Sequence, residues 1–175
     1  MIKTFFAYKD KMTARYTEDG KRVAATWFNI PVMSVVGSRN TSTLIKLQVN
    51  PKISKYKEIK NPVNLSEDVK VGTVVNVTNQ TLGRGFAGGV KRWGFAGGPR
   101  THGQSDREKA PGSSGGGTRM GRLYKGRHAP GKMGNHNVQV RNLTVLEVDL
   151  EKNKMLISGM VPGSALTLSR IEIVK

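Results

Sequence analysis

The segment from residue 82 to residue 141 limits most strongly what this 175-residue chain can fold into. It holds 16 of the chain's 21 glycines, and it carries 12 lysines and arginines against 2 acidic residues. Few of its residues are apolar, and ordering a backbone costs about 1–2 kcal/mol per residue, with glycine at the expensive end. Such a segment cannot pack as an ordinary domain, so a partner must supply much of its ordering energy.

The sequence on both sides of this segment predicts β-structure. Short runs rich in β-branched and aromatic residues, separated by turn residues, predict strands. The predicted strands are residues 2–8, 22–28, 31–37, 43–49, 71–78, 138–150, 154–160 and 170–174. Residues 51–70 are rich in lysine and are expected to be irregular, and residues 151–153 are expected to form a hairpin turn.

These elements predict a mainly β fold with few helices. We expect a small β-barrel with a long, irregular Gly/Arg-rich extension inserted between its strands. Residues 1–81 and 138–175 would form the barrel, and residues 82–137 would form an extended arm.

The overall charge predicts a polyanionic partner. The net charge is +17, which is hard to maintain without such a partner. Nucleic acid is the first candidate and an anionic membrane surface is the second. The absence of cysteine excludes disulfides, thiolate catalysis and cysteine-based zinc sites. No apolar run approaches the length of about 18 residues that spans a bilayer.

Two glycine-rich motifs resemble nucleotide-binding sequences. Residues 83–88 match G-x-G-x-x-G, but that fingerprint must open a helix, and we expect no helix to persist through the glycines and proline that follow. Residues 126–133 are close to a P-loop, but Met133 stands where Ser or Thr would bind magnesium. An enzyme that uses this second motif remains an alternative, although we predict no enzyme activity and no cofactor.

The basic segment is well suited to contact RNA. Arginine and lysine neutralise phosphates, and glycine lets the backbone approach a nucleic acid closely. Histidines surrounded by positive charge are more suited to stacking on bases or contacting phosphate than to binding a metal. Trp93 could stack on a base or anchor the arm to the barrel. The predicted RNA-binding residues are Arg84, Lys91, Arg92, Trp93, Arg100, His102, Arg107, Lys109, Arg119, Arg122, Lys125, Arg127, His128, Lys132, His136 and Arg141.

Three stretches of this segment resemble one known family. They are GRGFAGGVKRWGFAGGPRTHG (83–103), APGSSG (110–115) and GRLYKGRHAPGKMGNHNVQVRNL (121–143). KMTARYTEDGKRVAATWF (11–28) and LEVDLEKNKMLISGMVPG (146–163) show a weaker similarity. Together they resemble the universal third protein of the large ribosomal subunit, of bacterial or organellar type.

The resemblance implies a structural constituent of the large ribosomal subunit that binds ribosomal RNA directly. It also implies a barrel at the ribosome surface, a central extension that runs toward the peptidyl-transferase centre, and a role in subunit assembly. The implied partners are large-subunit ribosomal RNA and neighbouring large-subunit proteins, with no membrane and no small-molecule substrate. The implied location is the cytoplasmic ribosome, with an organellar ribosome left open.

The chain departs from the family's pattern in three places. The stretch before Val71 is shorter than is usual in the family. Gly116 stands where some members carry a methylated glutamine, and Gly115–Gly117 makes the expected tip of the arm bare. The rival interpretation is a free RNA chaperone with a basic arm, but generic Gly-Arg segments usually repeat, and this one does not.

Overall fold

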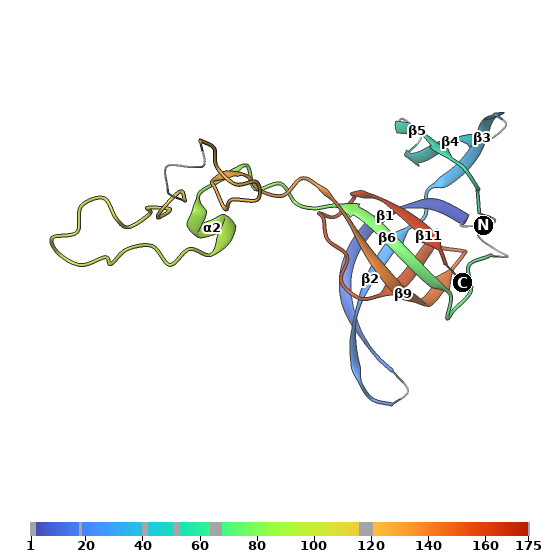
Figure 1. Cartoon of the computed structure of the whole chain (residues 1–175). Coiled ribbons are helices and arrows are strands. Elements are labelled where there is room, and N and C mark those ends of the chain that lie inside the picture. The colour runs from blue at the N-terminus through green and yellow to red at the C-terminus, as the bar shows by residue number, and fades with distance from the viewer. Residues whose placement is uncertain are drawn as a thin grey trace. The chain divides into compact units, whose positions relative to one another are not determined.

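The computed structural model describes residues 3–17, 19–39, 42–50, 53–63, 68–115 and 121–174. Strands dominate the described chain, which confirms the predicted mainly β fold. The chain divides into two compact units, Met1–Leu82 with His136–Lys175, and Gly83–Asn135 (Figure 1). We call them the first unit and the extension. In the described part of the chain, no helix is long and apolar enough to cross a membrane.

Six strands of the first unit form an antiparallel sheet that closes on itself, in the order β1-β11-β6-β9-β10-β2. β1 pairs with β11 on one side and with β2 on the other, so the ring has no free edge strand. The strands are β1 (Lys3–Tyr16), β2 (Arg22–Asn29), β6 (Val74–Gln80), β9 (Asn137–Asp149), β10 (Lys154–Ser158) and β11 (Leu168–Ile173).

The core of the ring follows from the alternation of side chains along its strands. Val75 and Val77 of β6 are fully buried inside the ring, together with Phe28 of β2. β1 differs because residues 4–9 are buried without alternation. Phe5 lies in the ring core, whereas its neighbour Phe6 belongs to a second cluster on the outer face.

A second, three-stranded sheet covers that outer face. It consists of β3 (Val32–Arg39), β4 (Ser42–Asn50) and β5 (Ile53–Ile59), in that order. Ile45, Leu47 and Ile59 pack with Phe6. The expectation that residues 51–70 are irregular was therefore wrong for β5. Its lysines recur at every second residue, as in a strand, and lie opposite residues of β4. The high lysine content concealed this strand pattern in the sequence.

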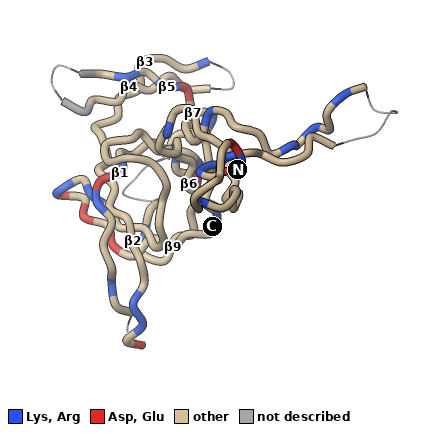
Figure 2. The backbone as a smooth tube through the Cα atoms, turned by 90° about the vertical axis from the view of Figure 1, so that its left-hand side faces the viewer, with Lys and Arg blue, Asp and Glu red and all other residues tan. Residues whose placement is uncertain are grey.

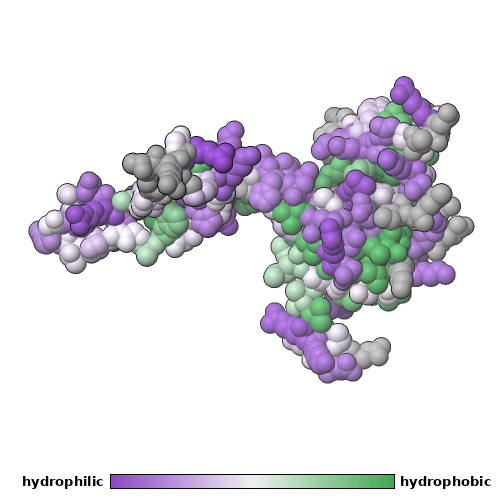
Figure 3. Space-filling view, viewed as in Figure 1, coloured by the Kyte–Doolittle hydropathy of each residue, from purple (hydrophilic) through white to green (hydrophobic). Residues whose placement is uncertain are grey.

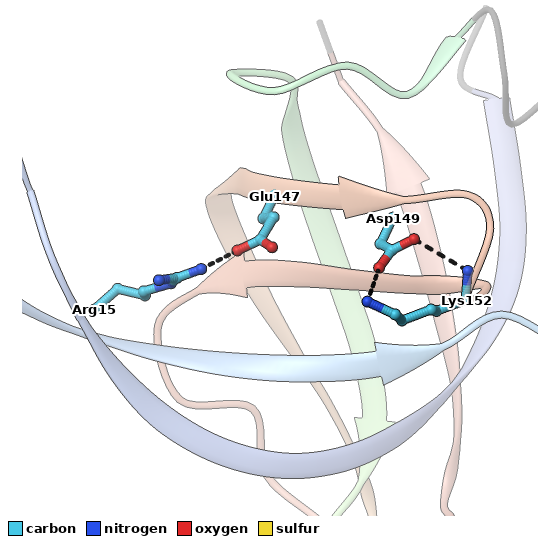
Figure 4. A network of polar contacts seen from close by, with 4 residues as sticks. All are labelled: Arg15, Glu147, Asp149 and Lys152. Atoms are coloured by element: carbon cyan, nitrogen blue, oxygen red, sulfur yellow. Dashed lines mark hydrogen bonds and ion pairs between the residues drawn. The ribbon is translucent and has the colours of Figure 1, made fainter.

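The predicted hairpin turn joins β9 and β10. The Asp149 carboxylate accepts a hydrogen bond from the Lys152 backbone N–H at 3.0 Å and pairs with its ammonium group at 3.2 Å (Figure 4). These contacts lower the pKa of Asp149 below its ordinary value, and the backbone hydrogen bond is the main cause. Arg15 of β1 forms an ion pair with Glu147 of β9. All four side chains are at the surface, so the ion pairs add little stability.

The turn that precedes β11 is held by two buried polar side chains. Asn79 Nδ2 donates to the Pro162 carbonyl at 2.7 Å, and Lys9 Nζ donates to the Gly163 carbonyl at 2.6 Å. Burial lowers the pKa of the Lys9 amine. A Cβ on Gly163 would lie 2.5 Å from the Gln80 carbonyl oxygen, so the turn packs closely against the end of β6.

Gly163→Ala is expected to destabilise the first unit more than Gly72→Ala. Both glycines have left-handed φ values, +99° and +91°, and an alanine there costs about 1–2 kcal/mol. Of the two, Gly163 faces a clash, because no described residue lies within 4 Å of the Cβ position of Gly72. Overpacking should add about 1–3 kcal/mol at Gly163. Urea denaturation of both variants measures the difference, and equal losses would contradict the close approach.

Candidate nucleic-acid interface

The extension begins as a short paired ladder. β7 (Phe86–Ala87) pairs antiparallel with β8 (Gly131–Lys132). Next to them, the Arg84 N–H donates to the Met133 carbonyl at 2.9 Å. The outgoing and returning segments of the extension are therefore joined by backbone hydrogen bonds. β8 lies within the near P-loop of residues 126–133, so this motif has the wrong local structure for a P-loop, which must open a helix.

A short helix, α2 (Gly89–Trp93), follows β7 directly. The expectation that no helix persists after the G-x-G-x-x-G motif was therefore wrong. Val90 and the residues after it are compatible with a helix, and Gly94 ends it in the left-handed conformation at φ +73°. The helix is only five residues long and follows a two-residue strand, so the βαβ unit that a dinucleotide site requires is not formed.

An aromatic clasp, consisting of Arg92, Trp93, His128 and Ala129, ties α2 to the returning segment. The rings of Trp93 and His128 are stacked, with centroids 4.0 Å apart and planes 7° apart. Trp93 Nε1 donates to the Ala129 carbonyl at 2.8 Å, and Arg92 Nη1 donates to the same oxygen at 2.9 Å. The Arg92 guanidinium also lies 5.0 Å from the centre of the Trp93 ring. Three predicted RNA-binding residues, Arg92, Trp93 and His128, are thus joined to each other or to the Ala129 carbonyl.

Two glycines allow a second close approach within the extension. The Gly98 N–H lies 3.1 Å from the carbonyl oxygens of both Arg107 and Glu108. A Cβ on Gly97 would lie 2.2 Å from the Glu108 oxygen, so a larger residue cannot be placed there. The Glu108 side chain pairs with Arg100, Nε to Oε1, at 3.0 Å. These glycines serve the internal folding of the extension.

The basic side chains of the extension face solvent. Arg92 and Arg127 are half-buried, and Arg119 lies outside the described residues. The exposed basic members of the predicted set within the extension are Arg84, Lys91, Arg100, His102, Arg107, Lys109, Arg122, Lys125, His128 and Lys132. Arg100–Glu108 is the one ion pair among the described residues of the extension. Basic positions outnumber acidic ones along the backbone in Figure 2, and the visible surface of the extension is mostly hydrophilic in Figure 3.

The described residues of the extension form almost no apolar core of their own. Ala87 is its one buried side chain among the described residues, and neither apolar cluster includes a residue of 83–135. Phe86, Leu123 and Tyr124 are more than half exposed. The extension therefore presents unpaired cations and aromatic faces, which are the groups that bind phosphates and stack on bases.

The last two predicted residues belong to the first unit. The His136 carbonyl accepts the Thr81 N–H at 2.9 Å, and Arg141 Nε donates to Gln139 Oε1 at 3.1 Å on β9. Arg141 is exposed and remains available for a phosphate. Among the residues that the structure describes, no group of three or more His, Asp or Glu residues could hold a metal ion. The Ala129 carbonyl of the clasp was missed, because no sequence signal marks a backbone acceptor.

Comparisons with known proteins identify relatives of this chain. The family model described as "Ribosomal protein L3" matches residues 39–161. The "Large ribosomal subunit protein uL3" of Dehalococcoides mccartyi is 52% identical over 105 residues, 60% of this chain and 51% of that protein. That of Chlorobium limicola is 44% identical over 122 residues, 70% of this chain and 58% of that protein. The chain spans about half the length of the curated relatives it matches.

Proposed function

The chain belongs to the ribosomal protein L3 family, and from this premise we propose that it is a structural constituent of the large ribosomal subunit. In this role it binds ribosomal RNA directly and catalyses no reaction. The observation that carries the proposal is the extension, whose described residues present exposed cations, form a single ion pair and belong to neither apolar cluster. RNA would neutralise this charge and supply the contacts that the extension cannot make internally.

The two units would have different tasks. The ring of the first unit would act as the small barrel that docks on the outside of the subunit, next to other large-subunit proteins. The extension would thread through folded RNA toward the peptidyl-transferase centre and support assembly of the subunit. Its irregular backbone and closely packed glycines suit crevices, which RNA offers and a regular double helix does not. The protein would work in the cytoplasmic ribosome, the compartment of its bacterial relatives.

The aromatic clasp gives the predicted contact residues different roles. The exposed cations of the extension, with His102 and Arg141, would contact phosphates. Arg92, Trp93 and His128 would first hold α2 in place, because their side chains already contact each other or the Ala129 carbonyl. Trp93 is 40% exposed, so part of its side chain would remain available to the RNA.

Sedimentation tests this proposal directly. A tagged copy of the chain in its host should sediment with the large subunit on a sucrose gradient, in stoichiometric amount, and should stay bound through a high-salt wash. An integral component survives this wash because many buried phosphate contacts must break together. Recovery in the light fractions, or release by the wash, would favour the free RNA chaperone. Nucleotide binding by the isolated protein that Lys132→Ala abolishes would instead favour the enzyme.

A further inference from the structure

A polar cleft lies in the first unit, and none of the predicted RNA-binding residues lines it. Its volume is about 490 Å³, within the range of small-ligand sites. One wall is the edge strand β5, with Lys55 and Lys57. The other walls are the outer face of the ring, with Phe6 and Arg170, and the loop before β11, with Leu166.

The register of β5 directs its two lysines into this cleft. Lys55 lies opposite Leu47 and Lys57 opposite Ile45, and both β4 residues are buried against the ring. Side chains opposite each other in a sheet share a face, so the lysines point the same way. Lys55 Nζ lies 5.9 Å from the centre of the ring of Tyr8, a residue of β1.

The charges around the cleft leave it positive. Arg170 Nη2 pairs with Glu172 at 2.7 Å, so that arginine is largely neutralised. Neither Lys55 nor Lys57 forms an ion pair with any residue that the structure describes. Glu58 contacts the Ser42 hydroxyl, and its place next to Lys57 in β5 puts it on the opposite face. Two lysines that pair with no acidic side chain of the described residues therefore face one concave surface.

Leu166 forms an unusual lip of the cleft. It is 70% exposed and has a φ of +62°, a conformation that costs a leucine about 1–2 kcal/mol. A hydrogen bond of 2.7 Å from its N–H to the Lys9 carbonyl helps to hold it there. A strained, exposed leucine next to a positive cleft provides an apolar face for a planar ligand. Thr78 and Asn137 add polar side chains to the lining.

We propose that this cleft binds one unpaired nucleotide of RNA. Lys55 and Lys57 would hold its phosphate, and Leu166 would pack against its base or ribose. A cation pair beside an apolar lip matches a nucleotide better than an acidic peptide, which has charge but no planar face. The inference rests on the proposed function, since it assumes that the chain binds RNA, but it assigns a second site outside the extension.

Photo-crosslinking of the full chain tests the site. The full chain is bound to large-subunit RNA that contains 4-thiouridine, and the complex is irradiated. The crosslinked peptides are then mapped by mass spectrometry. We expect crosslinks in the extension and also near Phe6 and Leu166. Lys55→Gln with Lys57→Gln should reduce the cleft crosslinks at least about fivefold and leave those in the extension unchanged. The matched control, Lys11→Gln with Lys21→Gln, removes the same charge from exposed positions of the first unit and should change neither set.

A second variant separates binding from folding. Leu166→Gly removes the lip and relieves the left-handed strain, so it should reduce the cleft crosslinks without lowering the melting temperature. Crosslinks confined to the extension would overturn the inference and leave the proposed function standing. No crosslinks anywhere would overturn both. Displacement by uridine monophosphate would support a nucleotide site, whereas equal displacement by polyglutamate would show a general anion site and refute it.

Discussion

Replacing Lys91, Arg122 and Lys125 together by glutamine is expected to weaken binding to large-subunit RNA by on the order of 10²-fold at about 0.15 M salt. All three side chains are exposed, and none has an ion pair among the described residues. Each phosphate contact releases counterions, so the plot of log K against log salt should become shallower by about 2–3 for three lost contacts. Titrations with fluorescent RNA between about 0.05 and 0.4 M salt measure both quantities.

The matched control neutralises three exposed cations of the first unit, Lys11, Lys21 and Arg22. It changes the net charge equally, so long-range attraction changes by a similar amount in both variants. If the extension makes the phosphate contacts, only the first variant should show the large change in slope. Equal losses in the two variants would mean that RNA senses only the overall charge, and the extension would then have no special role.

The strands could be predicted because their signal is local. Runs of β-branched and aromatic residues marked β2, β6 and β10 to within a few residues. The strand order could not be predicted, because β1 meets β11 at the other end of the chain. β5 was missed for the same reason: its lysines looked like a solvated segment, and only pairing with β4 shows that they share a face with buried residues.

Some features of the candidate site could likewise be predicted from the sequence, and others could not. The role of exposed cations such as Lys91 and Lys125 could be predicted from the composition. Basic residues without acidic neighbours need a counter-charge whatever the fold. The contacts of Trp93 were not predictable, since they join residues 35 and 36 positions away through a ring stack and a backbone carbonyl. The cleft was missed because it forms only when β5, the loop before β11 and the ring come together in space.

Phe28→Ala is expected to lower the free energy of unfolding by about 3–5 kcal/mol. Phe28 is completely buried in the ring core, where Met155 and Ile157 belong to the same cluster. Removing the phenyl group of Phe28 leaves a cavity that the closed sheet can only partly fill. Domains of this size have about 5–15 kcal/mol of stability, so this single change removes a large share of it. Urea denaturation followed by circular dichroism measures the loss.

Ile157→Val is the control, because it removes one methylene from the same core and should cost about 0.5–1.5 kcal/mol. No described residue of the extension belongs to this core, so Phe28→Ala should leave the salt dependence of RNA binding unchanged wherever the variant is folded. Conversely, the triple variant of Lys91, Arg122 and Lys125 should change the unfolding free energy by no more than about 0.5 kcal/mol. If Phe28→Ala altered the salt slope, the extension would depend on the ring core for its contacts, and stability and RNA binding would not be carried by separate units.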